Sequence, residues 1–297
     1  MKMESSAIDR YAIVTGGNKG IGYGICKKLA SKGIMVILTA RNEKRGLEAV
    51  QSLKEFGVSD FVVFHQLDVT DPSSVASLAD FIKTQFGRLD ILVNNAGVPP
   101  GKVNGAALFR KVSGEEVDWD KIVECNYEMS KACVETNYFG AVRVSEALLP
   151  LLHLSMAPTI VNVTSSIGLL KYIKNEWAKA VFSNMSNLTT EKLEEVVMEF
   201  MKDYKEGSLE AKGWPTIMPA NVISKTALNV YTKMLAHKYP HFRVNSVHPG
   251  FVKTDLTQNY GYLTVEEASE YPVNLALLPH NGPSGFLFDK DEQIPLE

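Results

Sequence analysis

One segment of the 297-residue sequence has a glycine spacing that could hold a phosphate group. It reads Thr15-Gly16-Gly17-Asn18-Lys19-Gly20-Ile21-Gly22 and directly follows the apolar residues 11–14. Its glycines would let a strand turn sharply into a helix, and would let the backbone approach a pyrophosphate at the positive N-terminal end of that helix. The segment therefore predicts a dinucleotide-binding turn, although glycine-rich turns also occur without any ligand.

Further polar residues and glycines follow later apolar runs of the sequence. Asn94-Asn95-Ala96-Gly97 follows one run, Thr164-Ser165-Ser166 follows another, and Pro249-Gly250 follows a third. Asn137 and Lys225 fall in segments with helical patterns. Hydroxyl, amide and ammonium groups of these kinds can bind and polarise a substrate oxygen.

The elements that must position these residues alternate along the chain, with short apolar, β-branched runs separated by longer helical patterns. Nearly continuous apolar strands indicate a sheet that is buried on both faces, and intervening helices indicate parallel pairing. We therefore predict an α/β fold of Rossmann type, with a doubly wound, mostly parallel sheet and helices on both faces. The predicted strands are 11–15, 34–39, 61–64, 91–93, 159–163, 243–247 and, near the C-terminus, 286–288.

Two stretches interrupt this alternation, at about 98–126 and 168–219, here called the first and the second insertion. Both contain helical periodicity, so we interpret residues 1–297 as a single domain that carries two insertions. Each follows the C-terminal end of a predicted strand, where open α/β sheets bind ligands, so we expect the insertions to cover the substrate. In the second insertion a helix should begin near Thr189 or Thr190, end near Gly207, and pack its apolar stripe on its own domain.

The composition of the chain restricts the classes of molecule that it can bind. The net charge is −3, the pI is about 6.1, and no run of lysine or arginine occurs, which argues against nucleic acid and anionic membranes. The first ten residues are polar and charged and no apolar stretch reaches about 18 residues, so we expect a cytoplasmic protein without a membrane span. Cys26, Cys125 and Cys133 lie in helix-like segments without paired spacing, which predicts reduced packing residues and no metal site.

In this order and placement, the motifs resemble the short-chain dehydrogenase/reductase family over about residues 8 to 290. The long second insertion resembles a plant branch of monomeric carbonyl reductases that act on terpenoid and alkaloid ketones or enones. The resemblance implies a monomer and the following cofactor contacts: Gly16, Asn18, Lys19, Gly20, Ile21 and Gly22 at the phosphates, Asp68 and Val69 at the adenine, Asn95, Ala96, Gly97 and Lys225 at the ribose, and Val252 and Thr254 at the nicotinamide amide.

The residue after the second strand indicates NADPH rather than NADH. That strand ends in Ala40-Arg41, without the acidic residue that would bind a free ribose 2′-hydroxyl. The guanidinium of Arg41 can pair with a 2′-phosphate in a bidentate manner, assisted by Lys19 and, in one interpretation, by Arg45. Arg45 has an equally simple interpretation as an exposed helix charge.

The resemblance also implies a catalytic set of asparagine, serine, tyrosine and lysine. Asn137, Ser165 and Lys225 match it, but Asn221 stands four residues before the lysine, where the family has its tyrosine. An amide has no dissociable proton near neutral pH, so it can polarise a carbonyl but cannot act as its general acid. Hydride addition to a conjugated enone needs only stabilisation of the enolate oxygen, which Ser165, Asn221 or Lys225 could supply. An ene-reductase of the resembling branch also lacks the tyrosine and has glutamate there.

The sequence therefore predicts an NADPH-dependent reductase that transfers hydride to a small hydrophobic α,β-unsaturated carbonyl compound, with the conjugated double bond preferred. Reduction of a ketone to an alcohol remains an alternative. In that case Asn221 is either a natural change that weakens a carbonyl reductase or an introduced substitution, or else Tyr172 or Tyr204 moves into the site as the proton donor. A further alternative is a non-redox isomerase or cyclase that keeps NADP⁺ as a scaffold. His248 is interpreted as a packed turn residue.

Overall fold

The computed structural model describes residues 10–297. Its centre is an eight-stranded sheet with the strand order β10-β9-β8-β7-β4-β1-β2-β3, in which all neighbours are parallel except β9 and β10. The chain leaves β1 toward β2 and β3 and returns to β4 on the other side, so the strand order reverses between β1 and β4. The strands are β1 (Tyr11–Val14), β2 (Met35–Ala40), β3 (Val62–Gln66), β4 (Ile91–Asn94), β7 (Thr159–Val163), β8 (Arg243–His248), β9 (Leu287–Asp289) and β10 (Glu292–Ile294).

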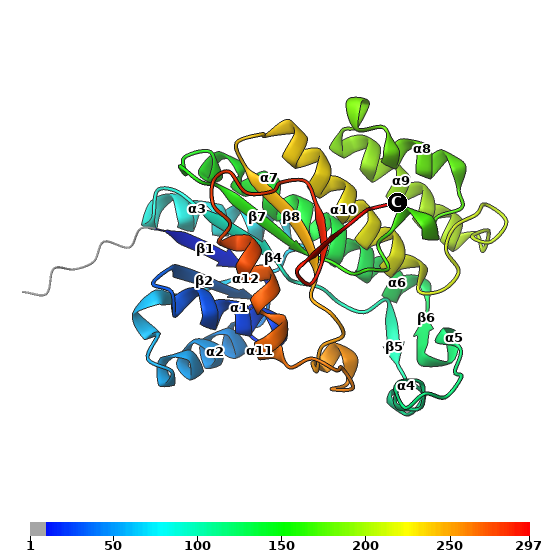
Figure 1. The fold of residues 1–297 in the computed structure, drawn as a ribbon, viewed down its shortest axis with the longest axis horizontal. Helices are drawn as coiled ribbons and strands as arrows, with labels where there is room; N and C mark the ends of the chain where they lie inside the picture. The colour runs from blue at the N-terminus through cyan, green and yellow to red at the C-terminus, as the bar shows by residue number, and fades with distance from the viewer. Residues whose placement is uncertain (1–9) are drawn as a thin grey trace, which may run out of the picture.

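Helices cover both faces of this sheet (Figure 1). Alternate strand residues enter opposite cores: Ile13 packs in the core under one helical layer, and Ala12 and Val14 pack in the other. The layer on the Ile13 side contains α3 (Pro72–Gln85), α6 (Tyr127–Val134), a π-helix (Glu135–Gly140), α7 (Ala141–Leu152) and α10 (Pro219–Lys238). The opposite layer contains α1 (Gly20–Ala30), α2 (Glu43–Glu55), α11 (Val265–Ala268) and α12 (Glu270–Ala276).

The predicted fold class is confirmed, and each predicted strand lies within one or two residues of an observed one. Three strands of the described chain were not predicted: β10, and strands β5 (Gly101–Val103) and β6 (Val123–Cys125), which pair as a separate antiparallel sheet inside the first insertion. The placement of Cys125 in a helix-like segment was wrong, because it ends β6. All three cysteines are free thiols.

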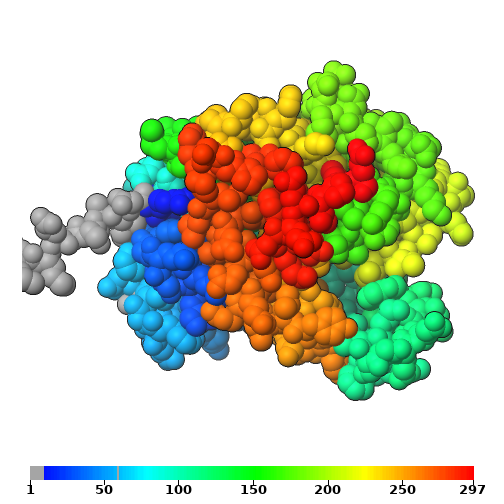
Figure 2. Space-filling view, viewed as in Figure 1, coloured from blue at the N-terminus to red at the C-terminus, as the bar shows by residue number. Residues whose placement is uncertain are grey.

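The first insertion continues from its two strands into α4 (Gly105–Val112) and α5 (Trp119–Ile122), and it has a small core of its own. Met218, Phe251 and Tyr260 from outside the insertion pack against that core. The side-chain amide of Gln258 also donates a hydrogen bond of 2.7 Å to the carbonyl of Val103. Figure 2 shows the insertion as a teal lobe beside the orange segment that follows β8.

The second insertion contains two 3₁₀ turns (Leu170–Tyr172 and Met185–Asn187) and the helices α8 (Glu176–Ser183) and α9 (Thr190–Lys205). Thr189 caps α9 by accepting a hydrogen bond from the backbone of Lys192, and Gly207 follows the helix with a φ of 70°. The apolar stripe of α9 is buried against α6 and α10. Both the predicted bounds of this helix and its packing on the same chain are therefore confirmed.

In residues 10–297, no helix is long and apolar enough to cross a bilayer. The polar stretch at the start of the sequence falls almost wholly on residues 1–9, outside the described part. The cytoplasmic location and the assignment of residues 1–297 to one domain stay predictions.

Candidate active site

The glycine turn between β1 and α1 has the geometry of a phosphate cradle. Gly16 and Gly20 have φ angles of 64° and 54°, which side chains rarely adopt. A Cβ on Gly22 would overlap the side-chain amide of Asn95 and the carbonyl of Gly16, so α1 begins in close contact with the turn. Asn18 and Ile21 lie half-buried in the same turn. These residues fit a pyrophosphate, because the turn brings backbone N–H groups to the start of α1 without side chains in the way.

The segment after β4 is fixed against this turn. The hydroxyl of Thr15 accepts hydrogen bonds of 2.9 Å from the backbone of Asn95 and of Ala96. The Asn95 amide in turn donates to the carbonyls of Thr15 and Gly16. Gly97 lies against Asn137, since a Cβ there would be 3.2 Å from Oδ1. The residues predicted to hold the ribose are thus joined to those predicted to hold the phosphates.

A polar recess of about 640 Å³ lies beside the ends of β2 and β3. Arg41 and Asp68, predicted for the 2′-phosphate and the adenine, both line it. Asp68 is held by the backbone and hydroxyl of Thr70, and the neighbouring Val69 is buried. Arg41 and Arg45 are exposed, so their guanidinium groups are accessible to a ligand phosphate.

The segment around Ser165, at the end of β7, packs on α10 beside Lys225. The ammonium of Lys225 donates a 3.0 Å hydrogen bond to the carbonyl of Val163, two residues before Ser165. The loop after Ser165 packs directly on α10, because a Cβ on Gly168 would lie 2.9 Å from that of Lys225. Burial lowers the pKa of Lys225 to about 8. Among the described residues nothing accepts a hydrogen bond from the Ser165 hydroxyl, which leaves it able to donate to a substrate oxygen.

Asn137 lies in a helical segment, as the sequence predicted, and this part of the segment is the π-helix between α6 and α7. Its amide accepts a 2.8 Å hydrogen bond from the backbone N–H of Val98 and returns one of 3.0 Å to the carbonyl. It also donates to Sγ of Cys133 at 3.2 Å, and Cys133 lies 4.0 Å from the hydroxyl of Ser224. Asn137 therefore connects the segment after β4 to α10 beside Lys225, and its side chain acts in the structure as a positioning group.

Asn221 lies in the first turn of α10, one helical turn before Lys225 and on the same face. Its backbone carbonyl accepts a hydrogen bond of 3.1 Å from Ser224. Its side chain is half-buried, and within residues 10–297 its amide has no hydrogen-bond partner. Met218, the residue that precedes α10, has a left-handed φ of 44°. The amide that replaces the expected phenol is thus free to bond a ligand.

The structure gives no support to the alternative tyrosine donors. The ring of Tyr204 packs on Tyr127 and Phe200, at centroid distances of 6.1 and 6.0 Å. Tyr172 is exposed beside the ammonium of Lys171. Neither phenol is hydrogen-bonded to a residue of the described chain. Burial lowers the pKa of His248, the last residue of β8, which agrees with a packed histidine.

The loop after β8 completes the site. Val252 is buried, and Thr254 begins a short 3₁₀ turn in which Thr257 accepts a hydrogen bond from its backbone N–H. The methyl group of Thr254 lies 3.4 Å from where a Cβ on Gly20 would be. Both residues predicted to meet the nicotinamide amide therefore belong to a loop that contacts the glycine turn.

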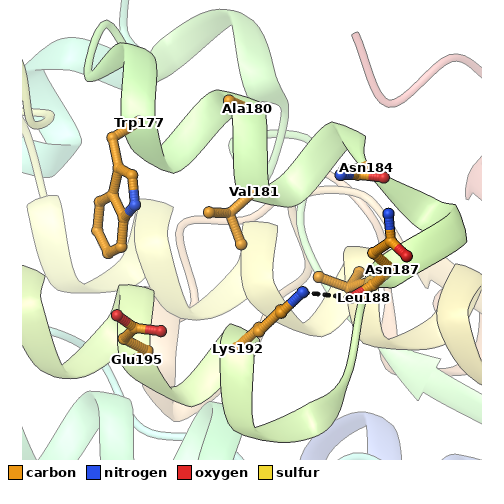
Figure 3. Close-up of a pocket in the computed structure, with 8 residues that line it drawn as sticks. All are labelled: Trp177, Ala180, Val181, Asn184, Asn187, Leu188, Lys192 and Glu195. Carbon is orange, nitrogen blue, oxygen red and sulfur yellow. Dashed lines mark hydrogen bonds between the residues drawn. The ribbon is translucent and has the colours of Figure 1, made fainter.

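A second hollow, of about 320 Å³, lies between α8 and α9 (Figure 3). Trp177 and Glu195 flank it on one side, and Lys192 bonds the carbonyl of Asn187 on the other. None of its lining residues belongs to the predicted catalytic or cofactor set, so it is separate from the site described above.

Sequence reasoning missed three supporting residues: Thr15, Cys133 and Met218. The four-residue spacing of Cys133 and Asn137 in a helical segment could have indicated their contact. No signal marks Met218, because methionine is rarely left-handed.

A family model described as short chain dehydrogenase matches residues 10–180. (+)-Neomenthol dehydrogenase from Arabidopsis thaliana is 53% identical, over 95% of this chain and 97% of that protein. (−)-Isopiperitenone reductase from Mentha piperita is 50% identical, over 97% and 99%. Carbonyl reductase (NADPH) 3 from Mus musculus is 37% identical, over 92% and 93%.

The solved structure of salutaridine reductase from Papaver somniferum has a TM-score of 0.88 and 47% identity, over 94% of this chain and 99% of that one. All four similar proteins are named as dehydrogenases or reductases. The resemblance seen in the sequence is thereby confirmed, together with the oxidoreductase class that it implied, and the chain belongs to the short-chain dehydrogenase/reductase family.

Proposed function

We propose that this oxidoreductase uses NADPH to reduce the conjugated double bond of a small hydrophobic enone of terpenoid or alkaloid type. Asn221 carries the proposal. It has a free amide on the Lys225 face of α10 and no dissociable proton. A site with this residue can stabilise an enolate oxygen but has lost the phenol that would protonate an alkoxide.

Separate sets of residues would bind the cofactor and stabilise the negative charge on the substrate oxygen. NADPH, when bound, supplies the hydride. The glycine turn would hold its pyrophosphate, and Arg41 with Lys19 would hold its 2′-phosphate. The Ser165 hydroxyl and the Asn221 amide would donate hydrogen bonds to the substrate oxygen, and the charge of Lys225 would favour the enolate. The α-carbon can then take its proton from water.

The relatives support the cofactor and the kind of substrate. Carbonyl reductase (NADPH) 3 carries the cofactor in its name, and the isopiperitenone, neomenthol and salutaridine enzymes are named for small cyclic natural products. Met218, just before α10, and Phe251, just after β8, both pack on the first insertion, so apolar side chains lie between the segments that carry Asn221 and Val252, which suits a hydrophobic substrate. We propose a monomer, since α9 covers α6 and α10 within the chain.

Product identity tests the proposal. The purified chain is incubated with NADPH and a cyclic enone, and the products are separated by gas chromatography. A saturated ketone is expected, and Ser165→Ala should lower its rate of formation. An allylic alcohol as the sole product would overturn the proposal.

Ketone reduction to an alcohol is the second candidate function. The contact of the Ser165 segment with Lys225 and the 53% identity to a neomenthol dehydrogenase favour it. A saturated cyclic ketone offered with NADPH distinguishes the two, because only this second function yields an alcohol. The non-redox alternative predicts substrate conversion without any consumption of NADPH.

A further inference from the structure

Asp255 forms an ion pair with Lys19, which is predicted to bind the cofactor. The ammonium of Lys19, in the glycine turn, lies 2.7 Å from Oδ2 of Asp255, in the short 3₁₀ turn (Asp255–Thr257) after β8. The two loops are in direct contact beside this pair, where the methyl group of Thr254 approaches Gly20. The ion pair therefore joins the glycine turn to the loop after β8, which carries the residues predicted to meet the nicotinamide.

The Asp255 carboxylate interacts with two of the cations that the sequence assigned to the cofactor phosphate. The hydrogen bond from Lys19 lowers the pKa of the Asp255 carboxyl, and the charge of Arg45 lowers it further from a greater distance. Lys19 and Arg45 are two of the three cations that the sequence assigned to the 2′-phosphate of NADPH. The side chains of Lys19 and Asp255 are 58% and 71% exposed, so the pair can open without disturbing a core.

We propose that Asp255 competes with the 2′-phosphate of NADPH for Lys19 and thereby sets how strongly the chain prefers the phosphorylated cofactor. The inference rests on the proposed use of NADPH. Without cofactor, the carboxylate neutralises Lys19. A phosphate monoester carries a charge of about −1.5 to −2 and can displace a single carboxylate from the ammonium. The affinity for the 2′-phosphate is reduced by the free energy needed to open the ion pair.

If Asp255 instead assisted phosphate binding, its removal would have the opposite effect. If Lys19 bridged Asp255 and the phosphate together, the carboxylate would orient the ammonium, and its removal would weaken binding. Exposed ion pairs contribute little stability, so competition from this pair should change the dissociation constant by about two- to fivefold.

Binding of NADP⁺, NAD⁺ and 2′,5′-ADP to the full-length chain tests the proposal by titration calorimetry at low salt. Asp255→Asn should lower the Kd of NADP⁺ and of 2′,5′-ADP by about two- to fivefold and change that of NAD⁺ less. Glu266→Gln is the matched control. It removes one exposed carboxylate from the ion pair with Lys28 on α1, and it should leave all three constants unchanged. Melting temperatures of both variants verify that they are folded.

Unchanged or weaker binding of NADP⁺ by Asp255→Asn would overturn the competition. An equal gain for NAD⁺ would also overturn it, because the effect would then come from the shared pyrophosphate. If the unaltered chain binds NAD⁺ but neither NADP⁺ nor 2′,5′-ADP, the proposed cofactor itself is wrong. In that case the failure lies in the proposed function, which the calorimetry of the unaltered chain reveals separately.

Discussion

The charge of Lys225 depends on the burial of its side chain. Burial lowers its pKa to about 8, so in the free enzyme the ammonium loses its proton above that pH. Because the charged form would favour the enolate, we expect kcat/KM to fall as the pH rises through about 8. A pH profile of kcat/KM reports the free enzyme and measures this directly.

Lys225→Arg provides the control, since arginine stays protonated throughout this range. Its activity should be lower overall, but the decline near pH 8 should disappear. In the unaltered chain, the free energy of unfolding should increase over the pH range in which kcat/KM falls. Between pH 8 and the ordinary lysine value of 10.5, the unfolded chain holds a proton that the folded chain has lost, so the free energy of unfolding rises with pH. A decline near pH 8 that persists in Lys225→Arg would show that another group titrates.

In the proposed function, Asn221 is the residue that favours reduction of the double bond over reduction of a ketone. Asn221→Tyr restores a phenol one turn before Lys225, where the Lys225 charge can lower its pKa. A positioned general acid contributes about a hundred- to ten-thousandfold, so ketone reduction should increase by about that factor. The rate of alcohol formation from a saturated cyclic ketone is the measurement.

Asn184→Tyr is the control for this substitution, because Asn184 is exposed and lines the separate hollow between α8 and α9. It should leave the alcohol yield unchanged. If Asn221→Tyr also leaves the yield unchanged, the missing phenol does not limit ketone reduction.

At the scale of elements, the sequence predicted those parts whose hydrophobic pattern is strong. Strands such as β2 and β7 were predictable because every residue in them is buried. Strands β5 and β10 are three residues long and carry polar residues such as Lys102 and Glu292, so no pattern could indicate them. The π-helix around Asn137 also leaves no compositional signal.

The segment after α9 is fixed by one buried carboxylate. Asp203 is 1% exposed and accepts hydrogen bonds from the indole of Trp214, at 2.8 Å, and from the ammonium of Lys212. Burial alone would raise the pKa of Asp203, but these two hydrogen bonds outweigh it and the pKa is lowered. The carboxylate therefore stabilises the fold at neutral pH, and this contribution is lost as the pH falls through the lowered pKa.

Asp203→Asn should lower the free energy of unfolding by about 1–3 kcal/mol, because the buried indole N–H and the lysine lose a charged acceptor. Urea unfolding at neutral pH measures this change. Glu210→Gln, an exposed position in the same segment, should have no effect. Equal stabilities of the two variants would show that the Asp203 contacts contribute nothing.

At the scale of the whole molecule, the site is assembled from distant parts of the chain. The sequence could indicate candidate residues because each of them follows a strand or lies in a helical segment. Their contacts could not, since the Asn137–Cys133 and Lys19–Asp255 pairs depend on how loops pack. The docking of the first insertion on Met218, Phe251 and Tyr260 likewise depends on tertiary structure alone.

The covering of α6 and α10 by α9 predicts the state of association. Val196, Val197 and Phe200 are fully buried within the chain, so this face is not available to a second copy, and we expect a monomer of 32.8 kDa. Sedimentation velocity over a range of concentrations measures the mass.

Met198, which is 58% exposed on the outer side of α9, tests the remaining surface: Met198→Lys should change neither the mass nor the stability. Val197→Lys should instead destabilise the chain, because a charge would be buried without a partner. A dimer that Met198→Lys dissociates would show that the outer face of α9, rather than its covered face, is the interface.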